Sequence, residues 1–369
     1  IIMKHLNIKQ LFIAVLLLTT GLYSCKKDNA EIPKTETVAG KYENGFFIIG
    51  EGSYGQSTGA INFYRYGEDT VGIRVYEKEN PGKILSNAAK TSTLQFASVI
   101  NGSIYLMCKV NGPIVKVNAL TLKEQARYVQ ESSNWRSIVQ VDGNRGLVSA
   151  NDGVYQIDLN TLALQNKLTT VGALNTGDML KKGDYVYLLQ SNGAKIISAS
   201  NYSLVKSFSN ISRGFAQTPN GKVWASTGTR LIGIDNNLDT AGVALSVSVG
   251  SFGLDAPTRI TASTKENAVF YHSGKSIYKY VDGNASSLAQ PFITITDDPF
   301  MIYGSIRYDK NKDYIVVNGI QAYGAGSTVN FLLIYNASTG VLVKKIKYGG
   351  DGVTVDFTKI YFPDLTVFH

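Results

Sequence analysis

Residues 183–197, GDYVYLLQSNGAKII, hold a turn signal, an apolar strand centred on Tyr187, a polar connection and a second short strand. The same arrangement recurs along the chain. From Tyr105 onward, the centres of the first strands lie 42, 40, 37, 46 and 45 residues apart. Strand groups that repeat at about 40–45 residues are typical of a β-propeller, whose blades are four-stranded sheets. The seven first-strand segments are Phe46-Phe47-Ile48, Ile104-Tyr105-Leu106, Gly146-Leu147-Val148, Val186-Tyr187-Leu188, Val223-Trp224-Ala225, Val269-Phe270-Tyr271 and Tyr314-Ile315-Val316.

Turn signals such as Asn101-Gly102 precede five of the seven segments, and such dipeptides join hairpin strands. We therefore predict an all-β, seven-bladed β-propeller over residues 44–369. The first blade has no innermost strand before Phe46. We expect the C-terminal segment 358–362 to pair with that blade, which closes the ring and removes exposed strand edges. A β-sandwich pair or a β-helix would need other repeat lengths.

The N-terminal segment has the features of an export signal. Residues 1–24 combine a basic start, a short apolar run and small residues, and the run is too short to span a membrane. Leu22-Tyr23-Ser24-Cys25 looks like a bacterial lipobox, which predicts lipidation of Cys25. Residues 25–43 are polar and read as a flexible tether. These features predict an outer-membrane lipoprotein exposed at the cell surface, with its lipid anchor in the membrane.

Composition excludes several classes of function. The formal net charge of +8 falls to +6 once the two lysines of residues 1–24 are removed, and no basic run with interleaved aromatic residues occurs. This argues against nucleic-acid binding. Two cysteines and three histidines argue against a disulfide scaffold and against a metal centre. Cys108 lies within an apolar run, so we expect it to be buried and inert.

The repeat also predicts a binding face. In a propeller, the loops that enter the innermost strands and the loops that leave the second strands lie on one face, around the mouth of the central channel. Arg136, Arg213 and Arg259 each lie 11 residues before a first-strand centre. Converging guanidinium groups suit phosphate or carboxylate groups, but arginines at such positions also brace neighbouring blades. Both interpretations stay open.

Other residues of these loops are amides, hydroxyls, acids and aromatic rings. Such a surface suits a sizeable polar ligand, and an ordinary solvated loop surface is the alternative. The complete set of candidate ligand-binding residues is Glu51, Ser53, Tyr54, Trp135, Arg136, Asn151, Asn192, Arg213, Arg259, His272 and Tyr303.

Catalytic motifs are weak. Ser–His–Asp chemistry would have to use His272 or His369, and no Gly-x-Ser-x-Gly motif frames a serine. The pair Asp297-Asp298 precedes a proline and reads as a solvated turn more than as a calcium or acid–base site. We therefore expect a binding protein without catalytic residues, metal or cofactor. A hydrolase or lyase that works through Glu51, His272 or this aspartate pair is the less favoured alternative.

Residues 46–55, FFIIGEGSYG, followed by residues 59–64, GAINFY, resemble the opening of the YncE-like surface lipoproteins of Bacteroidetes. Gly50 and Ser53 depart from that family's usual motif. The resemblance implies a seven-bladed propeller without catalytic activity that captures a nutrient for a TonB-dependent transporter. Its relatives include BtuG-type proteins, which capture cobalamin, so the resemblance makes a corrinoid the leading ligand. Recognition of a glycan or of a protein by the same face is the alternative.

Overall fold

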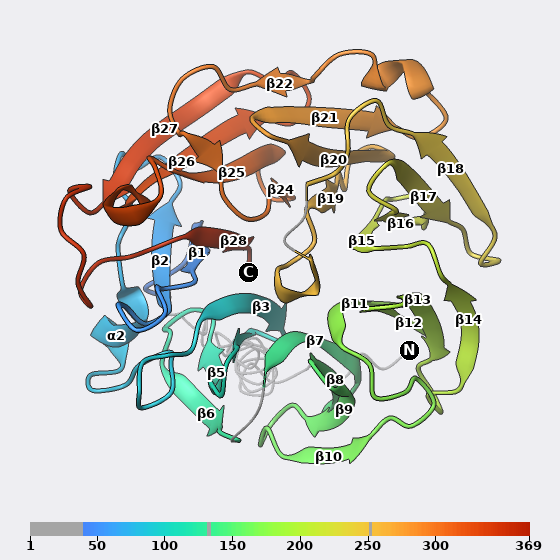
Figure 1. Cartoon of the computed structure of the whole chain (residues 1–369), viewed down its shortest axis with the longest axis horizontal. Coiled ribbons are helices and arrows are strands. Elements are labelled where there is room, and N and C mark those ends of the chain that lie inside the picture. Colours follow the sequence, from blue (N-terminus) through green and yellow to red (C-terminus); the bar gives the residue numbers. More distant parts are fainter. Residues whose placement is uncertain (1–39, 131–133, 251–252) are drawn as a thin grey trace, which may run out of the picture. The chain divides into compact units, whose positions relative to one another are not determined.

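The structure is a computed structural model that describes residues 40–369, except residues 131–133 and 251–252. The described chain forms seven antiparallel sheets that stand as blades around a central channel (Figure 1). The predicted seven-bladed β-propeller is therefore confirmed. Residues 1–24, the proposed lipidation site Cys25 and most of the proposed tether lie outside the described residues. Within the described part, no helix is long and apolar enough to cross a membrane.

Blades 2 to 6 each contain four strands, which follow one another in the sequence from the channel outward. Blade 2 contains β3 (Leu94–Ile100), β4 (Ser103–Cys108), β5 (Ile114–Asn118) and β6 (Glu124–Tyr128). Blade 3 contains β7 (Trp135–Asp142), β8 (Arg145–Ala150), β9 (Gly153–Asp158) and β10 (Leu164–Lys167). Blade 4 contains β11 (Thr176–Lys182), β12 (Tyr185–Gln190), β13 (Gly193–Ser198) and β14 (Leu204–Phe208). Blade 5 contains β15 (Arg213–Gln217), β16 (Val223–Ser226), β17 (Arg230–Ile234) and β18 (Thr240–Ala244). Blade 6 contains β19 (Ile260–Ala262), β20 (Ala268–Ser273), β21 (Ser276–Val281) and β22 (Ile293–Thr294).

Blades 7 and 1 depart from this pattern. The innermost position of blade 7 is split between two short strands. Blade 1 has three strands, and in place of a fourth strand Gly72 forms a single bridge to Phe63 of the third strand and a short helix follows. Blade 7 contains β23 (Met301–Ile302), β24 (Arg307–Asp309), β25 (Tyr314–Ile320), β26 (Val329–Asn336) and β27 (Leu342–Gly349). Blade 1 contains β28 (Pro363–Val367), β1 (Gly45–Gly50), β2 (Ala60–Arg65) and the helix α2 (Val75–Glu79). The 3-10 turns η2 (Gly253–Asp255), η3 (Ala285–Leu288) and η4 (Gly324–Thr328) lie in connecting loops.

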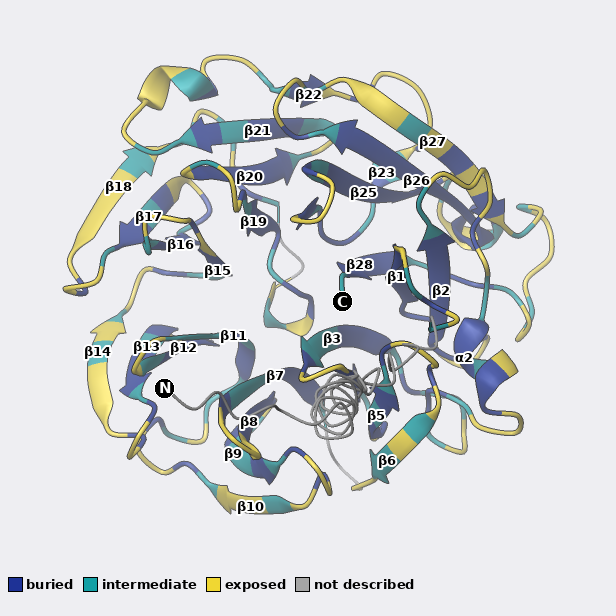
Figure 2. Ribbon diagram, turned by 180° about the vertical axis from the view of Figure 1, so that it is seen from behind, coloured by how far each residue is buried: buried dark blue, intermediate teal, exposed yellow. Residues whose placement is uncertain are grey.

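Apolar side chains fill the spaces between neighbouring blades. Tyr187 and Phe215 meet edge to face between blades 4 and 5, with ring centroids 5.8 Å apart. The second strands are buried almost throughout, whereas the outermost strands β10, β14, β18 and β27 carry most of the exposed positions (Figure 2). Both faces of the central strands pack on a neighbouring blade, which explains their continuous apolar runs. Cys108 is fully buried in this packing, as predicted, and burial raises the pKa of its thiol to about 12.

The ring closes through the C-terminal strand, but with different residues from those predicted. β28 (Pro363–Val367) pairs antiparallel with β1 and brings Leu365 opposite Ile49. The predicted segment 358–362 precedes it as a connection, in which Phe362 has a left-handed φ of 51°. Leu365 and Val367 are buried between blades 1 and 2. All five residues of β28 are buried, which fits an innermost strand enclosed by its neighbours, while the polar residues Thr358 and Lys359 suit a loop.

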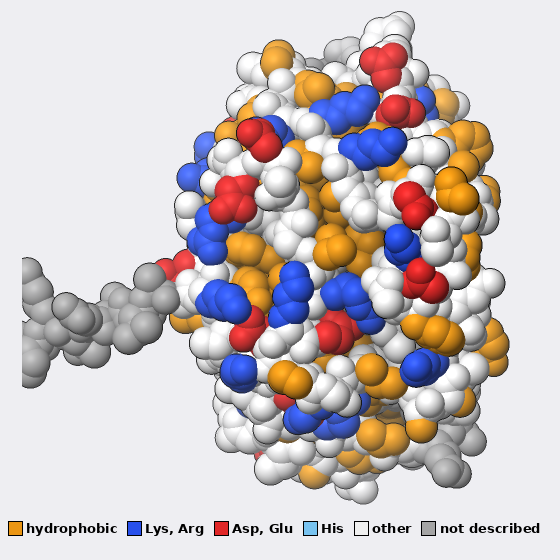
Figure 3. Space-filling model, turned by 90° about the vertical axis from the view of Figure 1, so that its left-hand side faces the viewer, with side chains coloured by type: hydrophobic (Ala, Val, Ile, Leu, Met, Phe, Trp, Pro, Cys, Tyr) orange, Lys and Arg blue, Asp and Glu red, His pale blue; other side chains and the backbone are white. Residues whose placement is uncertain are grey.

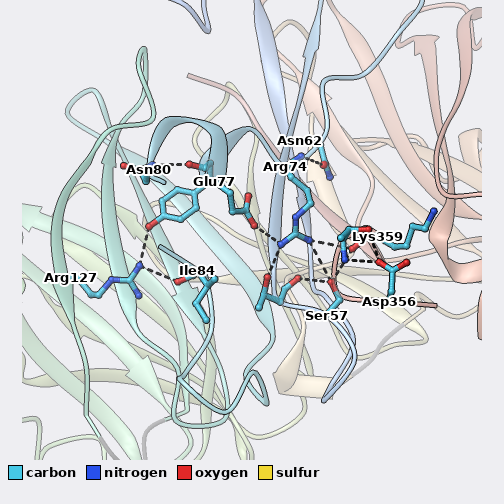
Figure 4. A network of polar contacts seen from close by, with 12 residues as sticks. Ser57, Asn62, Arg74, Glu77, Asn80, Ile84, Arg127, Asp356 and Lys359 are labelled. Atoms are coloured by element: carbon cyan, nitrogen blue, oxygen red, sulfur yellow. Dashed lines mark hydrogen bonds and ion pairs between the residues drawn. The ribbon is translucent and has the colours of Figure 1, made fainter. Parts of the chain in front are cut away.

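A cluster of polar contacts holds this closing connection against blade 1 (Figure 4). Arg74 donates through Nη2 to Glu77 Oε1 at 2.6 Å and to Thr58 Oγ1 at 2.8 Å. Its Nη1 donates to the backbone oxygen of Lys359 at 3.2 Å. The hydroxyl of Ser57 donates to the same oxygen at 2.9 Å. One guanidinium therefore joins the helix α2, the loop after β1 and the connection to β28.

The packed unit begins a few residues before position 44. Tyr42 is 4% exposed and lies in the core between blades 1 and 2, and its backbone N–H donates to Leu120 O at 3.1 Å. Arg65 donates to the backbone oxygens of Lys41 and Glu43. Residues 40–43, placed in the tether by the sequence pattern, thus belong to the propeller. Leu120 lies in the loop between β5 and β6, so the chain enters the propeller on that face.

The side of the ring that includes blade 7 and blade 1 shows lysine and arginine side chains interspersed with aspartate and glutamate (Figure 3). Lys344 forms an ion pair with Asp69 on this side, and Arg74 forms one with Glu77. The basic side chains therefore form no continuous positive surface on this side of the ring.

Candidate functional site

One face of the ring collects the starts of the innermost strands and the ends of the second strands. In blade 2, Leu94 at the start of β3 lies opposite Cys108 at the end of β4. In blade 4, Thr176 lies opposite Gln190 in the same way. We call this side the mouth face. The hairpin turns between the first two strands and the entry of the chain near Leu120 lie on the other side, which we call the opposite face.

A β-bulge interrupts the innermost strand near the mouth face in five blades, namely blades 1 to 5. In blade 2 the extra residue is Gln95, between the paired residues Leu94 and Phe96. In blade 1 it is Asp364, between Pro363 and Leu365. A bulge adds a residue, bends the strand and changes the direction of side chains. In blades 1 and 2 the bulge therefore sets the directions of two polar side chains, Asp364 and Gln95.

The loop between blades 5 and 6 fills the mouth of the channel. The loop connects β18 to β19, and its residues 253–258, which we call the plug, extend into the middle of the ring (Figure 1). Lys109 Nζ donates to the backbone oxygen of Asp255 at 3.0 Å. The guanidinium of Arg136 forms an ion pair with the carboxylate of Asp255, with Nε at 3.0 Å from Oδ1. Blades 2 and 3 thus hold the end of the plug.

Blades 4 and 7 hold its base. Asp178 Oδ2 accepts a hydrogen bond from the backbone N–H of Thr258 at 2.7 Å, and Arg307 Nη1 donates to Thr258 O at 2.8 Å. The plug also packs on Gly177, where a Cβ atom would lie 2.9 Å from the backbone oxygen of Leu254. Four blades that do not carry the plug therefore fix its position.

Beside the plug, ionisable side chains gather in a buried cluster. Glu51 is 8% exposed, and its Oε1 accepts hydrogen bonds from Gln95 Nε2 at 2.7 Å and from Tyr303 OH at 3.2 Å. Burial raises the pKa of Glu51, although the charges of Lys109 and Arg259 oppose this shift. Burial likewise lowers the pKa of Lys109. The cluster therefore carries both signs of charge in a weakly solvated environment.

Asp364 interacts electrostatically with this cluster. Its side chain is fully buried, and neither carboxylate oxygen has a hydrogen-bond partner among the described residues. Burial and the charge of Glu51 raise the pKa of Asp364 to about 8, against the opposing charges of Arg259 and Arg307. Gly304 allows this arrangement, because a Cβ atom on it would lie 2.1 Å from Asp364 Oδ1.

The three arginines at equal sequence offsets lie near the start of their innermost strands but make different contacts. Arg213 lies in the first residue pair of its strand, opposite Ser226, whereas Arg136 follows the first pair, Trp135 with Ala150. Arg259 precedes β19. Arg136 pairs with Asp255, Arg213 Nη1 donates to Ser212 O at 3.1 Å, and Arg259 Nη1 lies 3.3 Å from His272 Nε2. Arg213 lines a cavity of about 10 Å³ beside the plug, which has room for roughly one water molecule.

A family model described as a domain of unknown function, DUF5074, matches residues 44–369. The chain belongs to the DUF5074 family. None of the curated proteins compared with it matches. Among solved structures, the chain is similar to a quinonprotein alcohol dehydrogenase-like protein from Bacteroides thetaiotaomicron, with a TM-score of 0.71 and 19% identity. That alignment covers 89% of this chain and 78% of the other.

Apo AztD from Citrobacter koseri is similar over 88% of this chain and 97% of its own, with a TM-score of 0.50 and 8% identity. At such identities, both likenesses show the fold alone. They agree with the propeller fold of this chain and leave its ligand open.

The other candidate residues of this DUF5074 propeller divide into buried and exposed groups. Trp135 is 1% exposed and packs between Tyr128 and Tyr155, so its side chain belongs to the core. Ser53 lies in a tight turn with Ser57. Tyr54, Asn151 and Asn192 are exposed in loops of the mouth face.

Among the described residues, His272 contacts a guanidinium and backbone carbonyls. Its Nε2 lies 3.3 Å from Arg259 Nη1 and 3.2 Å from the backbone oxygen of Gly304, and its Nδ1 lies 3.3 Å from Gly274 O. Burial, together with the charge of Arg259, lowers the pKa of His272 to about 4, so the ring is neutral at pH 7. A neutral histidine between a guanidinium and backbone carbonyls fits a role in packing. The pair Asp297-Asp298 is exposed, and no group of three metal-ligating side chains occurs among the described residues.

All four exposed aromatic side chains in the described part of the DUF5074 propeller lie in loops of the mouth face. Tyr54 is 63% exposed, Phe300 58%, Tyr323 58% and Phe357 44%. Phe300 and Tyr323 meet edge to face, with centroids 6.3 Å apart, and Lys90 Nζ lies 4.4 Å from the ring centroid of Phe357. We call these four residues the aromatic rim. Of the four, only Tyr54 was among the predicted site residues.

The rim occupies one sector of the mouth face. Tyr54 follows β1, Phe357 precedes β28, Phe300 precedes β23 and Tyr323 follows β25, so all four belong to blades 1 and 7. The mouth face thus combines an apolar sector with a plug and a charged cluster. Such a combination of aromatic surface and a few polar groups is typical of ligand-binding surfaces.

Proposed function

We propose that this protein captures a nutrient ligand on its mouth face for a TonB-dependent transporter, as a lipid-anchored protein of the outer membrane, and that it performs no catalysis. The observation that carries the proposal is the confinement of every exposed aromatic side chain of the described residues to this face. Exposed aromatic surface costs solubility, and its concentration in one sector indicates a binding partner.

The plug supports binding of a large ligand on the face rather than inside the channel. Its base is fixed by Asp178 and Arg307, and the cavity beside it is too small for anything larger than roughly one water molecule. A ligand at this face must therefore spread over the plug and the aromatic rim. A broad, partly apolar molecule with polar substituents meets this requirement.

A corrinoid such as cobalamin is the ligand to test first. Its macrocycle offers a broad surface to the aromatic rim, while its amides and phosphate suit the polar groups of the plug and the charged cluster. Lys109 and Arg259 are the cations beside Glu51 in this cluster. A glycan that stacks on the same rings is the second candidate, because aromatic rings with adaptable polar neighbours also suit sugars.

The position of the chain entry supports capture by a tethered protein. Residues 40–43 pack near Leu120 on the opposite face, so an N-terminal anchor would leave the mouth face unobstructed. The absence of catalytic partners around His272 within the described residues supports a role in binding. Cobalamin is expected to bind unchanged and to be released unchanged.

Titration of the full-length chain with cyanocobalamin, followed by calorimetry and by corrin absorbance, tests the proposal. We expect saturable binding at micromolar ligand that is lost when Tyr54 and Tyr323 are both replaced by alanine. The double variant Leu204→Ala/Val341→Ala removes exposed apolar side chains elsewhere and serves as the control. No binding to wild type would exclude a corrinoid, and binding on a glycan array would then support the second candidate.

A further inference from the structure

The channel below the plug forms a second cavity that the mouth face does not use. Its volume is about 290 Å³, and Pro257 of the plug lies at one end together with Asp178 and Arg307. A wider cavity of about 440 Å³ shares Ser98 and Val99 with it and extends to Asn101, which is exposed on the opposite face. The channel is therefore closed by the plug at the mouth face and accessible from the opposite face.

The closed end presents one carboxylate and one guanidinium. Asp178 and Arg307 influence each other's pKa, yet no ion pair joins them within the described part of the chain. Each holds the backbone of Thr258 through a single atom, Oδ2 of Asp178 and Nη1 of Arg307. Among the described residues, no hydrogen bond involves Oδ1 of Asp178 or Nε and Nη2 of Arg307. Asp178 and Arg307 therefore keep one acceptor oxygen and several N–H donors with which they can bind another group while they hold the plug.

The walls of this cavity are partly apolar. Val99, Leu365, Val367 and Phe368 line it, and the hydroxyl-bearing residues Ser98, Ser137 and Thr366 also contribute. Its volume lies just below the usual range of about 300–1,000 Å³ for ligand pockets, so a small molecule fits best. Burial of a charged ligand group requires an oppositely charged partner. The end wall supplies one partner of each sign.

We propose that this channel is a binding site for a small zwitterion with an apolar side chain, of the α-amino acid class. The ligand carboxylate accepts hydrogen bonds from Arg307, its ammonium group donates to Asp178, and its apolar side chain lies against Val99 and Phe368. The geometry favours a zwitterion over a simple anion or cation, because only a zwitterion offers an opposite charge to both Asp178 and Arg307. The site is separate from the mouth face, and the two can be tested independently.

Calorimetry on the full-length chain with L-leucine, L-valine and glycine tests the proposal. Two further probes each lack one charge of leucine: 4-methylpentanoate lacks the ammonium group, and isoamylamine lacks the carboxylate. We expect leucine or valine to bind, and both one-charge probes to bind at least about tenfold more weakly. Absence of binding by all three amino acids at millimolar concentration, or equal binding of the one-charge probes, overturns the proposal.

Two variants locate the site. Asp178→Asn keeps an acceptor for Thr258 N–H but removes the charge, and Ser98→Phe fills the cavity without changing either charged residue. Both are expected to reduce amino-acid binding by at least about tenfold. Asp184→Asn and Ser200→Phe, at exposed turn positions, are the matched controls and are expected to bind like wild type. Thermal unfolding verifies that each variant is folded.

The outcome at the mouth face is a separate readout. Ser98→Phe is expected to leave cobalamin or glycan binding unchanged, because Ser98 lies on the channel side of the plug. Amino-acid binding that persists in both Ser98→Phe and Asp178→Asn would place the ligand elsewhere and refute this site. Loss of amino-acid binding in both variants, with the controls unaffected, supports it whatever the ligand of the mouth face is.

Discussion

Arg136 of blade 3 and Asp255 of the plug form an ion pair across the mouth of the channel, although 119 residues separate them in the sequence. The two partners differ in environment. The side chain of Arg136 is 2% exposed, whereas that of Asp255 is 56% exposed. Burial would raise the pKa of Asp255, but the hydrogen bond and charge of Arg136 outweigh this effect and lower it.

This difference predicts unequal costs for breaking the pair. Asp255→Ala leaves a buried guanidinium without its partner and is expected to cost about 3 kcal/mol of unfolding free energy. Arg136→Met leaves a carboxylate that water reaches, and is expected to cost about 1 kcal/mol. Urea unfolding of both variants measures the difference. Equal losses would mean that the plug relaxes to solvate Arg136.

The stability of the protein is expected to depend on the pH through Asp364. Burial raises the pKa of this carboxyl from about 4 to about 8, so between these values the folded state holds a proton that the unfolded state has lost. The contribution of Asp364 to stability is fully present below pH 4 and is lost as the pH rises through 8. Asp364→Asn cannot ionise. Its stability relative to wild type should therefore be greater at pH 8 than at pH 5, as measured by urea unfolding at both values, and a difference that does not change with pH would contradict this.

The closing strand is expected to be essential for folding. A chain that ends at Phe362 lacks β28 and exposes the edge of β1, together with the buried side chains that Leu365 and Val367 cover. We expect this truncation to aggregate, because an unpaired apolar edge recruits other strands. Removal of Phe368 and His369 alone leaves β28 intact and is the control. Soluble expression and circular dichroism distinguish the two, and a folded 1–362 chain would show that the ring closes by another route.

Arg74 is expected to stabilise the ring closure through geometry as well as charge. Arg74→Lys keeps one positive charge but cannot reach Glu77, Thr58 and the backbone of Lys359 together. Both Arg74→Lys and Arg74→Ala should lower the unfolding free energy, by about 1–3 kcal/mol. Arg230→Lys, at an exposed position on blade 5, is the comparison. A wild-type unfolding free energy in Arg74→Lys would mean that only the positive charge of Arg74 matters.

The aromatic rim is expected to serve binding and not stability. Phe300→Ala and Phe357→Ala remove side chains that are 58% and 44% exposed, so the melting temperature should change little. Ligand affinity at the mouth face should fall, since aromatic anchors contribute a large share of binding energy. Thermal melts and ligand titrations of the same preparations separate the two effects. A large loss of stability would instead assign the rim to folding.

Much of the fold follows from local sequence. The repeat of apolar segments near Tyr187 predicted the blades, and Asn101-Gly102 predicted a tight hairpin turn that the structure contains between Ile100 and Ser103. The closing strand was expected in the correct region but a few residues too early. Segment 363–367 contains a proline and an aspartate, which weaken its strand pattern and leave it less apolar than the connection before it.

The site was less predictable. Trp135 lies in an aromatic context that suits a ligand as well as a core, and only packing shows that it is buried. Phe300 and Phe357 lie in loops whose course no periodicity describes. Asp178 and Asp364 carry no motif, because their importance comes from partners in other blades.

The sequence by itself determined the seven-bladed repeat, the closure by a C-terminal strand and the burial of Cys108, because alternating side chains along one strand report locally which faces must leave water. Only the tertiary structure decided that the mouth of the channel is plugged, that Arg136, Arg213 and Arg259 differ in role, and that Asp178 and Arg307 face each other across Thr258. These relationships join residues from different blades. They also depend on bulges that shift the register by one residue and so reverse the direction of side chains, which the spacing of residues along the chain does not report.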